Sequence, residues 1–397
     1  MIAGRVVAAL SASQLIGWGA TFYVVGVFGD RIVADTGWSR SLVHAGFSLA
    51  LLVMGFASPA IGRAIDRAGG RNVMVAGSLA STLGLLALAT AHHLVHWFAA
   101  WVVLGVAMRM TLYDACFAAL VRIDPATARR AITTVTLSGG LASTVFWFIG
   151  EALADRLGWR GATVVFAGFT FLTLPLHLAI PKVGAPDAAP AGGIPPRPLA
   201  PPLATTPEEA RAAAILFGIV AVATSVLASA LAAHLIPLMV ALGMAVPVAV
   251  TVSSLRGVGQ SAARLAEFAS GGRTHPLDLT LFACLLLPAT LAFAPFAGIS
   301  TAAALVFSIG GGCGNGVVTI ARGAVPLVLF EPRVYGTVTG RIGAPAFWFS
   351  ALAPFAVALV LDHGGPMAAL VALAVPAIAA ALAAFALRRR FRPAAIA

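Results

Sequence analysis

The sequence predicts an all-α polytopic membrane protein with twelve transmembrane helices arranged as two six-helix bundles. Of its 397 residues, 60% are hydrophobic and only 10% are charged, whereas soluble proteins are roughly 45–50% apolar and about 25% charged. The apolar residues form continuous runs of roughly the 20 residues that a membrane-spanning helix needs. They do not form the alternating segments of about ten residues that are typical of membrane β-barrels. This composition excludes a soluble globular protein and a disordered chain.

Twelve apolar runs follow one another along the chain. The first has Arg5 in front of it, but it is too long for a signal peptide and eleven more runs follow it. We therefore expect it to be a retained first helix. The runs are 6–29, 41–62, 72–91, 97–120, 131–150, 161–180, 212–236, 246–268, 276–296, 299–321, 337–361 and 366–387.

A proline-rich stretch separates the sixth run from the seventh. Residues 181–211 hold nine of the 24 prolines of the chain, a composition typical of an extended linker. The predicted organisation is therefore an N-terminal bundle over 1–180, a cytoplasmic linker over 181–211, and a C-terminal bundle over 212–397.

The basic residues are distributed unevenly between the two sides of this topology. The formal net charge is +11, which indicates either a nucleic-acid-binding protein or a membrane protein with basic cytoplasmic loops. If both termini are cytoplasmic, nineteen of the 25 basic residues lie inside and four lie outside. This bias predicts a multi-pass protein of the cell inner membrane with cytoplasmic termini, and it makes nucleic acid an unexpected partner.

The segment after the second run carries a recognisable motif. It reads Gly62-Arg63-Ala64-Ile65-Asp66-Arg67-Ala68-Gly69-Gly70-Arg71, and a related pattern recurs over 264–273. The first copy resembles the loop signature of the major facilitator superfamily, which has a basic residue where Gly70 stands. With twelve spans and a central linker, the resemblance covers the whole chain. The matching residues are Gly62, Asp66, Arg67, Gly69 and Arg71.

The resemblance implies two parallel repeats that alternate access to a central site. It also implies that Asp66 is part of a conformational latch, because a carboxylate at a helix end interacts favourably with the N-terminus of a neighbouring helix. The alternative for this motif is a solvated charged turn that only sets topology.

Two shorter segments resemble bacterial relatives of the monocarboxylate transporters. They are Asp35-Thr36-Gly37-Trp38-Ser39-Arg40 and Leu157-Gly158-Trp159-Arg160. An arginine in the eighth run adds to this resemblance. Animal members carry an acid one turn before that arginine, where this chain has Val252.

Arg256, in the middle of the eighth run, is the leading candidate for substrate binding. A charge in the bilayer is costly and usually faces a cavity, and no acid lies within one turn of Arg256 in the sequence. Gln260 follows four residues later and shares its helical face. A guanidinium can hold a carboxylate with two parallel hydrogen bonds. The alternative is that Arg256 pairs with an acid from another helix.

Other polar residues within the runs are further candidates. In a continuous fourth helix, Tyr113 shares a face with Arg109, and both are predicted to bind substrate. Asp114 is either a proton carrier or a structural counter-ion for an arginine. Asn315 stands in a glycine-rich part of the tenth run and is a further substrate candidate. Gln14, Trp18, Thr21 and Tyr23 form a polar side of the first helix, for which interhelical hydrogen bonding is the simpler expectation.

Together these features predict a secondary transporter that moves a small organic anion with protons. The chain shows no phosphate-binding loop and no hydrolase or metalloprotease motif, so we expect no enzyme activity, no cofactor and no metal site. We expect a monomer whose C-terminal Arg388-Arg389-Arg390 contacts anionic lipid. The alternatives are a proton-coupled exporter of amphipathic drugs, a non-transporting membrane receptor and an intramembrane enzyme.

Overall fold

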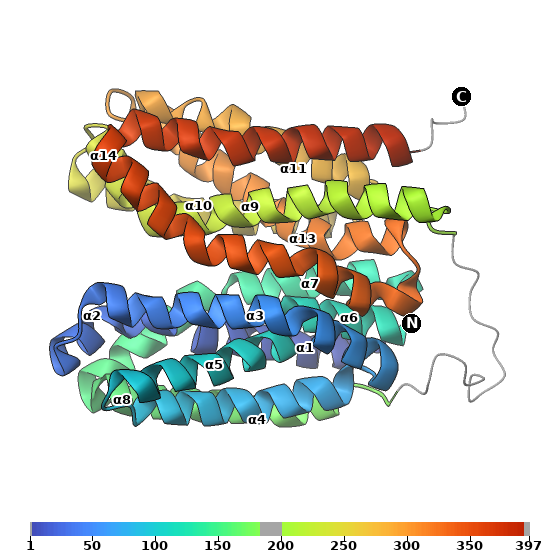
Figure 1. The fold of residues 1–397 in the computed structure, drawn as a ribbon, viewed down its shortest axis with the longest axis horizontal. Helices are drawn as coiled ribbons and strands as arrows, with labels where there is room; N and C mark the ends of the chain where they lie inside the picture. The colour runs from blue at the N-terminus through green and yellow to red at the C-terminus, as the bar shows by residue number, and fades with distance from the viewer. Residues whose placement is uncertain (1, 183–200, 393–397) are drawn as a thin grey trace. The chain divides into compact units, whose positions relative to one another are not determined.

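All regular elements in the described part of the chain are helices, as the continuous apolar runs predict (Figure 1). The computed structural model describes residues 2–182 and 201–392. Most of the predicted linker therefore lies outside the described residues. Helix α9 begins at Pro207, before the predicted end of the linker at residue 211. Its start is set by a capping box, in which the Thr206 hydroxyl accepts from the Glu209 amide and the Glu209 carboxylate accepts from the Thr206 amide.

The chain forms two compact units, which are described separately. Unit 1 comprises Met1–Ala200 and Pro332–Ala344, and unit 2 comprises Pro201–Glu331 and Pro345–Ala397. The short second segment of unit 1 contains the beginning of helix α14, so this helix contributes residues to both units.

Unit 1 contains the first six predicted spans. In it α4 packs against α5 and α8, α3 packs against α5, and α1 packs against α7 and α8. Its elements are α1 (Gly4–Gly17), the π-helix η1 (Trp18–Phe22), α2 (Val24–Thr36), α3 (Arg40–Ala68), α4 (Gly70–Ala89), α5 (Leu94–Thr111), α6 (Tyr113–Ile123), α7 (Pro125–Gly140) and α8 (Ala142–Leu178).

Unit 2 is organised around α13, which packs against both α10 and α11. Buried leucine, valine and alanine side chains form its core. The elements of unit 2 are α9 (Pro207–Ala241), α10 (Val246–Ala269), α11 (Pro276–Leu291), η2 (Ala294–Phe296), α12 (Thr301–Leu305), the π-helix η3 (Val306–Gly310), α13 (Gly311–Leu329) and the part of α14 (Tyr335–Phe391) from Pro345 onward. The short helix η4 (Pro332–Val334) and the beginning of α14 belong to unit 1.

These elements accommodate the twelve predicted spans. By length and composition, nine helical stretches of the described chain could cross a membrane. Two of them, Pro125–Leu178 and Pro332–Phe391, are long enough for two passes. Each has non-helical backbone at a glycine, Gly158 in α8 (φ 67°) and Gly365 in α14 (φ 74°). Glycine adopts positive φ without steric cost. α10, which carries Arg256, supplies the remaining span although it is not among the nine.

The prediction of one continuous fourth helix is wrong. It is interrupted at Leu112, where the backbone is extended (φ −79°, ψ −171°), so that α5 ends at Thr111 and α6 begins at Tyr113. Arg109 and Tyr113 therefore do not share a helical face. The interruption is stabilised from another helix, because Gln14 Nε2 donates to the Thr111 carbonyl at 2.7 Å. That bond replaces an intrahelical one, and a local sequence pattern does not reveal it.

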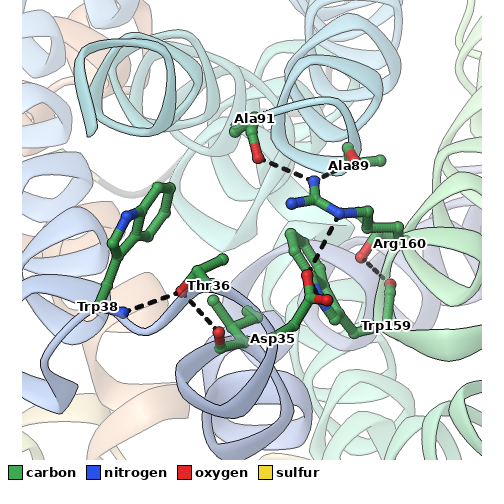
Figure 2. Close-up of polar contacts among 9 residues, drawn as sticks. Asp35, Thr36, Trp38, Ala89, Ala91, Trp159 and Arg160 are labelled. Carbon is green, nitrogen blue, oxygen red and sulfur yellow. Dashed lines mark hydrogen bonds and ion pairs between the residues drawn. The ribbon is translucent and has the colours of Figure 1, made fainter. Parts of the chain in front are cut away.

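The two segments that resemble the monocarboxylate transporters meet in unit 1. Figure 2 shows the Arg160 guanidinium between the Asp35 carboxylate and the carbonyls of Ala89 and Ala91. Arg160 Nη1 lies 2.8 Å from each carbonyl oxygen, and Trp159 Nε1 donates to Asp35 Oδ2 at 2.9 Å. This contact joins the ends of α2, α4 and the second half of α8, and it places a cation at the C-terminus of α4, where the helix dipole favours it.

Most of the basic residues predicted to face outward are paired with acids. Arg31 Nη2 lies 2.7 Å from Glu151 and 2.6 Å from Asp155, and Arg40 lies 2.7 Å from Asp30. With Arg160, three of the four basic residues predicted outside thus have an acidic partner. The nearby carboxylates therefore largely balance the positive charge of these arginines.

Candidate functional site

Arg256 is buried in unit 2. Its side chain lies in the middle of α10, and the residue is 8% exposed. Its Nη1 atom is buried, and no hydrogen bond or ion pair joins it to any other residue that the structure describes. A buried guanidinium is costly unless something balances its charge, so Arg256 needs a partner of opposite charge.

A small cavity lies beside the Arg256 side chain. Its volume is about 10 Å³, which is room for about one water molecule. The walls come from α9, α10, α11, η3 and α13, and they are mostly apolar. The lining residues are Leu227, Leu231, Arg256, Leu287, Thr290, Leu291, Phe307 and Gly311.

Gly311 leaves space beside Arg256, and Thr290 supplies the second polar group of this cavity. A methyl group on Gly311 would lie 3.1 Å from Arg256 Nη1 and 3.6 Å from Thr290 Oγ1. The missing side chain therefore keeps the region beside both atoms open. Thr290 Oγ1 donates to the Leu286 carbonyl at 2.8 Å, which leaves its oxygen able to accept. The sequence analysis missed both residues, because they lie on other helices and no local pattern links them to Arg256.

Gln260 and Asn315 do not line this cavity, although both are partly buried. A methyl group on Gly312 would meet the Arg256 carbonyl, and one on Gly316 would meet the Gln260 carbonyl at 2.5 Å. The glycines around Asn315 thus allow α10 and α13 to approach closely.

In unit 1, Arg109 and Tyr113 both have protein partners. Arg109 is 2% exposed, and its Nε donates to Ser58 Oγ at 2.7 Å. The Tyr113 hydroxyl donates to the Thr136 carbonyl at 3.2 Å. Asp114 lies in the first turn of α6, where a carboxylate interacts favourably with the helix dipole. The interruption at Leu112 creates this helix N-terminus, which a continuous fourth helix would lack.

Asp66 contacts the N-terminus of α14 within unit 1. It lies in the last turn of α3 and is 9% exposed. Its Oδ1 accepts from the Gly336 amide at 2.8 Å, and its Oδ2 accepts from the Thr337 amide at 2.6 Å. The first amides of a helix lack intrahelical partners, so the carboxylate satisfies two of them and faces the positive end of the dipole.

Small residues let α3 and α14 approach closely at this contact. A methyl group on Gly336 would come within 2.7 Å of both Asp66 Oδ1 and the Gly62 carbonyl, and one on Gly340 would lie 2.6 Å from the Ser58 carbonyl. Gly62 is equally restricted, because a methyl group there would meet the Gly336 carbonyl. The sequence indicated Gly62 and Asp66 but did not indicate their partners on α14.

The rest of the motif forms the turn between α3 and α4. Gly69 has φ 81°, and its amide donates to the Ile65 carbonyl at 2.8 Å. A methyl group on Gly70 would meet Ala119, so a basic side chain would not fit at this departure from the family signature. Arg67 is exposed and Arg71 is half-buried. Among the described residues, no group of three or more His, Cys, Asp or Glu could hold a metal ion.

Comparisons with known proteins identify the family. The family model of the Major Facilitator Superfamily matches residues 10–342. No curated protein matches the sequence. Among solved structures, the human organic anion transporter MFSD10 (TETRAN) superposes with a TM-score of 0.68 at 16% sequence identity, covering 96% of this chain and 99% of that one. The predicted fold, two bundles of six membrane helices, is confirmed, and the chain is a membrane transporter that belongs to the major facilitator superfamily.

Proposed function

We propose that this transporter moves a small organic anion together with protons by alternating access. One observation carries the proposal: the Arg256 guanidinium is buried beside a cavity and has no hydrogen-bonding partner among the described residues. A carboxylate would balance its charge and accept two parallel hydrogen bonds. The similar solved structure is that of an organic anion transporter, which supports the same substrate class.

The cavity beside Arg256 must widen to admit a substrate. A volume of about 10 Å³ does not hold a carboxylate, so the surrounding helices move apart when substrate binds. Close glycine contacts join α13 and the neighbouring η3 to both α10 and α11 and make this group of helices rigid. We therefore expect the leucine-bearing helix α9 to move. Gln260, Asn315, Arg109 and Tyr113 remain candidates for contacts that form on opening.

Asp66 is the proposed conformational latch and Asp114 the proposed proton carrier. The two hydrogen bonds that Asp66 accepts from amides in the first turn of α14 hold α3 and α14 together in the state described. Breaking and remaking them accompanies the change of access. Both termini are proposed to be cytoplasmic and the protein to reside in the inner membrane.

Uptake into proteoliposomes tests the substrate class. Purified protein is reconstituted with a pH gradient, and uptake of radiolabelled mono- and dicarboxylates is measured for wild type, Arg256→Lys and Arg256→Ala. We expect wild-type uptake to depend on the gradient. Arg256→Ala should abolish uptake, and Arg256→Lys should weaken it severalfold, since lysine keeps the charge but not the planar pair of donors.

Arg322→Lys is the matched control. Arg322 is also a partly buried arginine of unit 2, but its Nη1 donates to Ser225 Oγ at 3.1 Å. The Arg322→Lys variant should transport at the wild-type rate. A folded Arg256→Ala protein with normal uptake would remove the organic-anion proposal.

If Arg256→Ala folds and transports organic acids normally, the alternative of a drug exporter gains support. Most walls of the cavity are leucine and phenylalanine side chains, and these would suit the apolar part of an amphipathic compound. Export of a lipophilic dye by cells producing Arg256→Ala would identify that activity.

A further inference from the structure

One face of α1 and of the first residue of η1 carries buried polar side-chain atoms that have no hydrogen-bonding partner in the described part of the chain. Ser11 Oγ, Gln14 Oε1 and Trp18 Nε1 are buried, and none has a hydrogen-bonding partner among the described residues. They are spaced three and four positions apart, which places them on one side of the helix. Gln14 is fully buried, with 0% exposed. More than about nine in ten buried polar groups are paired, so this cluster indicates a bound group.

The orientation of Gln14 identifies which atom is free. Its Nε2 donates to the Thr111 carbonyl at 2.7 Å, and a carbonyl can only accept. The amide nitrogen therefore faces Thr111, and Oε1 is the remaining acceptor. The Thr111 carbonyl is available because the helix is interrupted at Leu112, so the interruption and the orientation of Gln14 belong to one arrangement.

The Trp18 indole is held by aromatic packing. Its ring centroid lies 4.7 Å from that of Phe22 and 4.8 Å from that of Tyr113. Trp18 also begins the π-helix η1, and π-helical segments often occur at functional sites. The buried Nε1–H is therefore a donor of fixed position, on the residue four positions after Gln14.

We propose that Gln14 and Trp18 form a binding site in unit 1 for a hydroxyl group. The hydroxyl would donate to Gln14 Oε1 and accept from Trp18 Nε1, with Ser11 Oγ as an additional partner. A carboxylate cannot donate and an ammonium group cannot accept, so a neutral hydroxyl is the simplest group that satisfies both atoms. This proposal does not involve Arg256 and does not depend on the organic-anion proposal. The hydroxyl could come from a transported solute or from water, and we assign it to the solute.

Other buried indoles in unit 1 show why Trp18 differs. Trp97 Nε1 and Trp101 Nε1 are also buried without a described partner. However, a methyl group on Gly46 would lie 2.6 Å and 2.5 Å from these two atoms, so both pack directly against the backbone of α3. They leave no room for a ligand.

Binding of matched solutes tests the proposal. The pairs are methyl propanoate with methyl 2-hydroxypropanoate, which are neutral and in which only the hydroxyl can donate, and propanoate with 2-hydroxypropanoate. Dissociation constants are measured by calorimetry on detergent-solubilised full-length protein. We expect wild type to bind each hydroxylated member at least about tenfold more tightly. Trp18→Phe keeps an aromatic ring but removes the N–H and should abolish this preference in both pairs.

Trp101→Phe is the matched control, because it makes the same change at a buried indole without a ligand space, and it should retain the preference. Ser11→Ala is the second variant and should reduce the preference if Trp18→Phe does not fold. Equal affinities within both pairs in wild type, or an unchanged preference in Trp18→Phe, would overturn the proposal and assign the site to water. The neutral pair contains no carboxylate, so its result stands even if the organic-anion proposal fails.

Discussion

Arg109 Nε donates a hydrogen bond to Ser58 Oγ at 2.7 Å, and the backbone carbonyl of the same Ser58 lies against Gly340 at the start of α14. Arg109 thus supports, from α5, the surface of α3 on which α14 packs. Sequence analysis placed Arg109 among the substrate-binding residues. Its burial and its bond to Ser58 favour a role in holding α3 in position.

Replacing Arg109 tests these two roles. We expect Arg109→Lys to lower the thermal midpoint in detergent, because a buried bond to a charged group contributes about 1.5–3 kcal/mol. Ser58→Ala should lower it at least as much, since it removes the same bond and leaves the buried, charged Nε without this acceptor. Thermal unfolding and transport kinetics are both measured for each variant and for wild type. An increase in KM at unchanged stability would support the substrate role instead.

Asp66→Asn should slow transport while leaving expression and substrate affinity intact. An asparagine offers one acceptor oxygen, so it can satisfy only one of the amides of Gly336 and Thr337. The lost interaction with the helix N-terminus is worth about 0.3–2 kcal/mol. Transport rates in proteoliposomes measure the effect. Glu208→Gln is the control, because Glu208 is an exposed acid in the first turn of another helix, α9. Unchanged rates in Asp66→Asn would leave the motif with a topological role only.

Gly336→Ala should also slow transport, because the added methyl group crowds the contact between α3 and α14. The added methyl group would come within 2.7 Å of Asp66 Oδ1 and of the Gly62 carbonyl, so α3 and α14 would have to separate. Gly343→Ala, two turns further along α14, is the matched substitution, since a methyl group there meets no other atom within 4 Å. Equal transport by the two variants would show that close packing at Gly336 is not required.

Arg160→Ala should destabilise the protein more than Asp35→Asn. Arg160 donates to the carbonyls of Ala89 and Ala91 and also stacks 4.3 Å from the Trp159 ring centroid, so its removal leaves two carbonyls without a donor. The Asp35 side chain is half exposed, and an exposed ion pair contributes only about 0–1 kcal/mol. Thermal midpoints in detergent give the ranking. Arg156→Ala, at an exposed neighbouring position, should be neutral, and an equal loss in all three variants would contradict the assignment.

Cysteine labelling checks the predicted topology. In a variant without the three native cysteines, Lys182→Cys and His92→Cys each introduce one thiol at an exposed position. The charge bias predicts that residue 92 faces outward and residue 182 faces the cytoplasm. An impermeant maleimide added to intact cells should label only the first. Labelling at residue 182 from outside would reverse the orientation.

The sequence alone determined the class of the protein, the number of spans and the family motif. Runs of apolar residues identify membrane helices because the bilayer imposes their length and composition, and this property is local. Arg256 was identified for the same reason, since a charge within an apolar run is conspicuous wherever the chain folds. The glycines of the motif were also recognisable, because their spacing along one segment is fixed.

Only the tertiary structure decided which groups meet. Asp66 and Gly336 are 270 residues apart, and nothing near either position specifies the other. The interruption at Leu112 depends on the side-chain amide of Gln14, which donates to the Thr111 carbonyl 97 residues further along the chain. The surroundings of Arg256 come from four other segments of unit 2. In each case a polar group on one helix is satisfied, or left unsatisfied, by the packing of another helix, and helical periodicity carries no information about that partner.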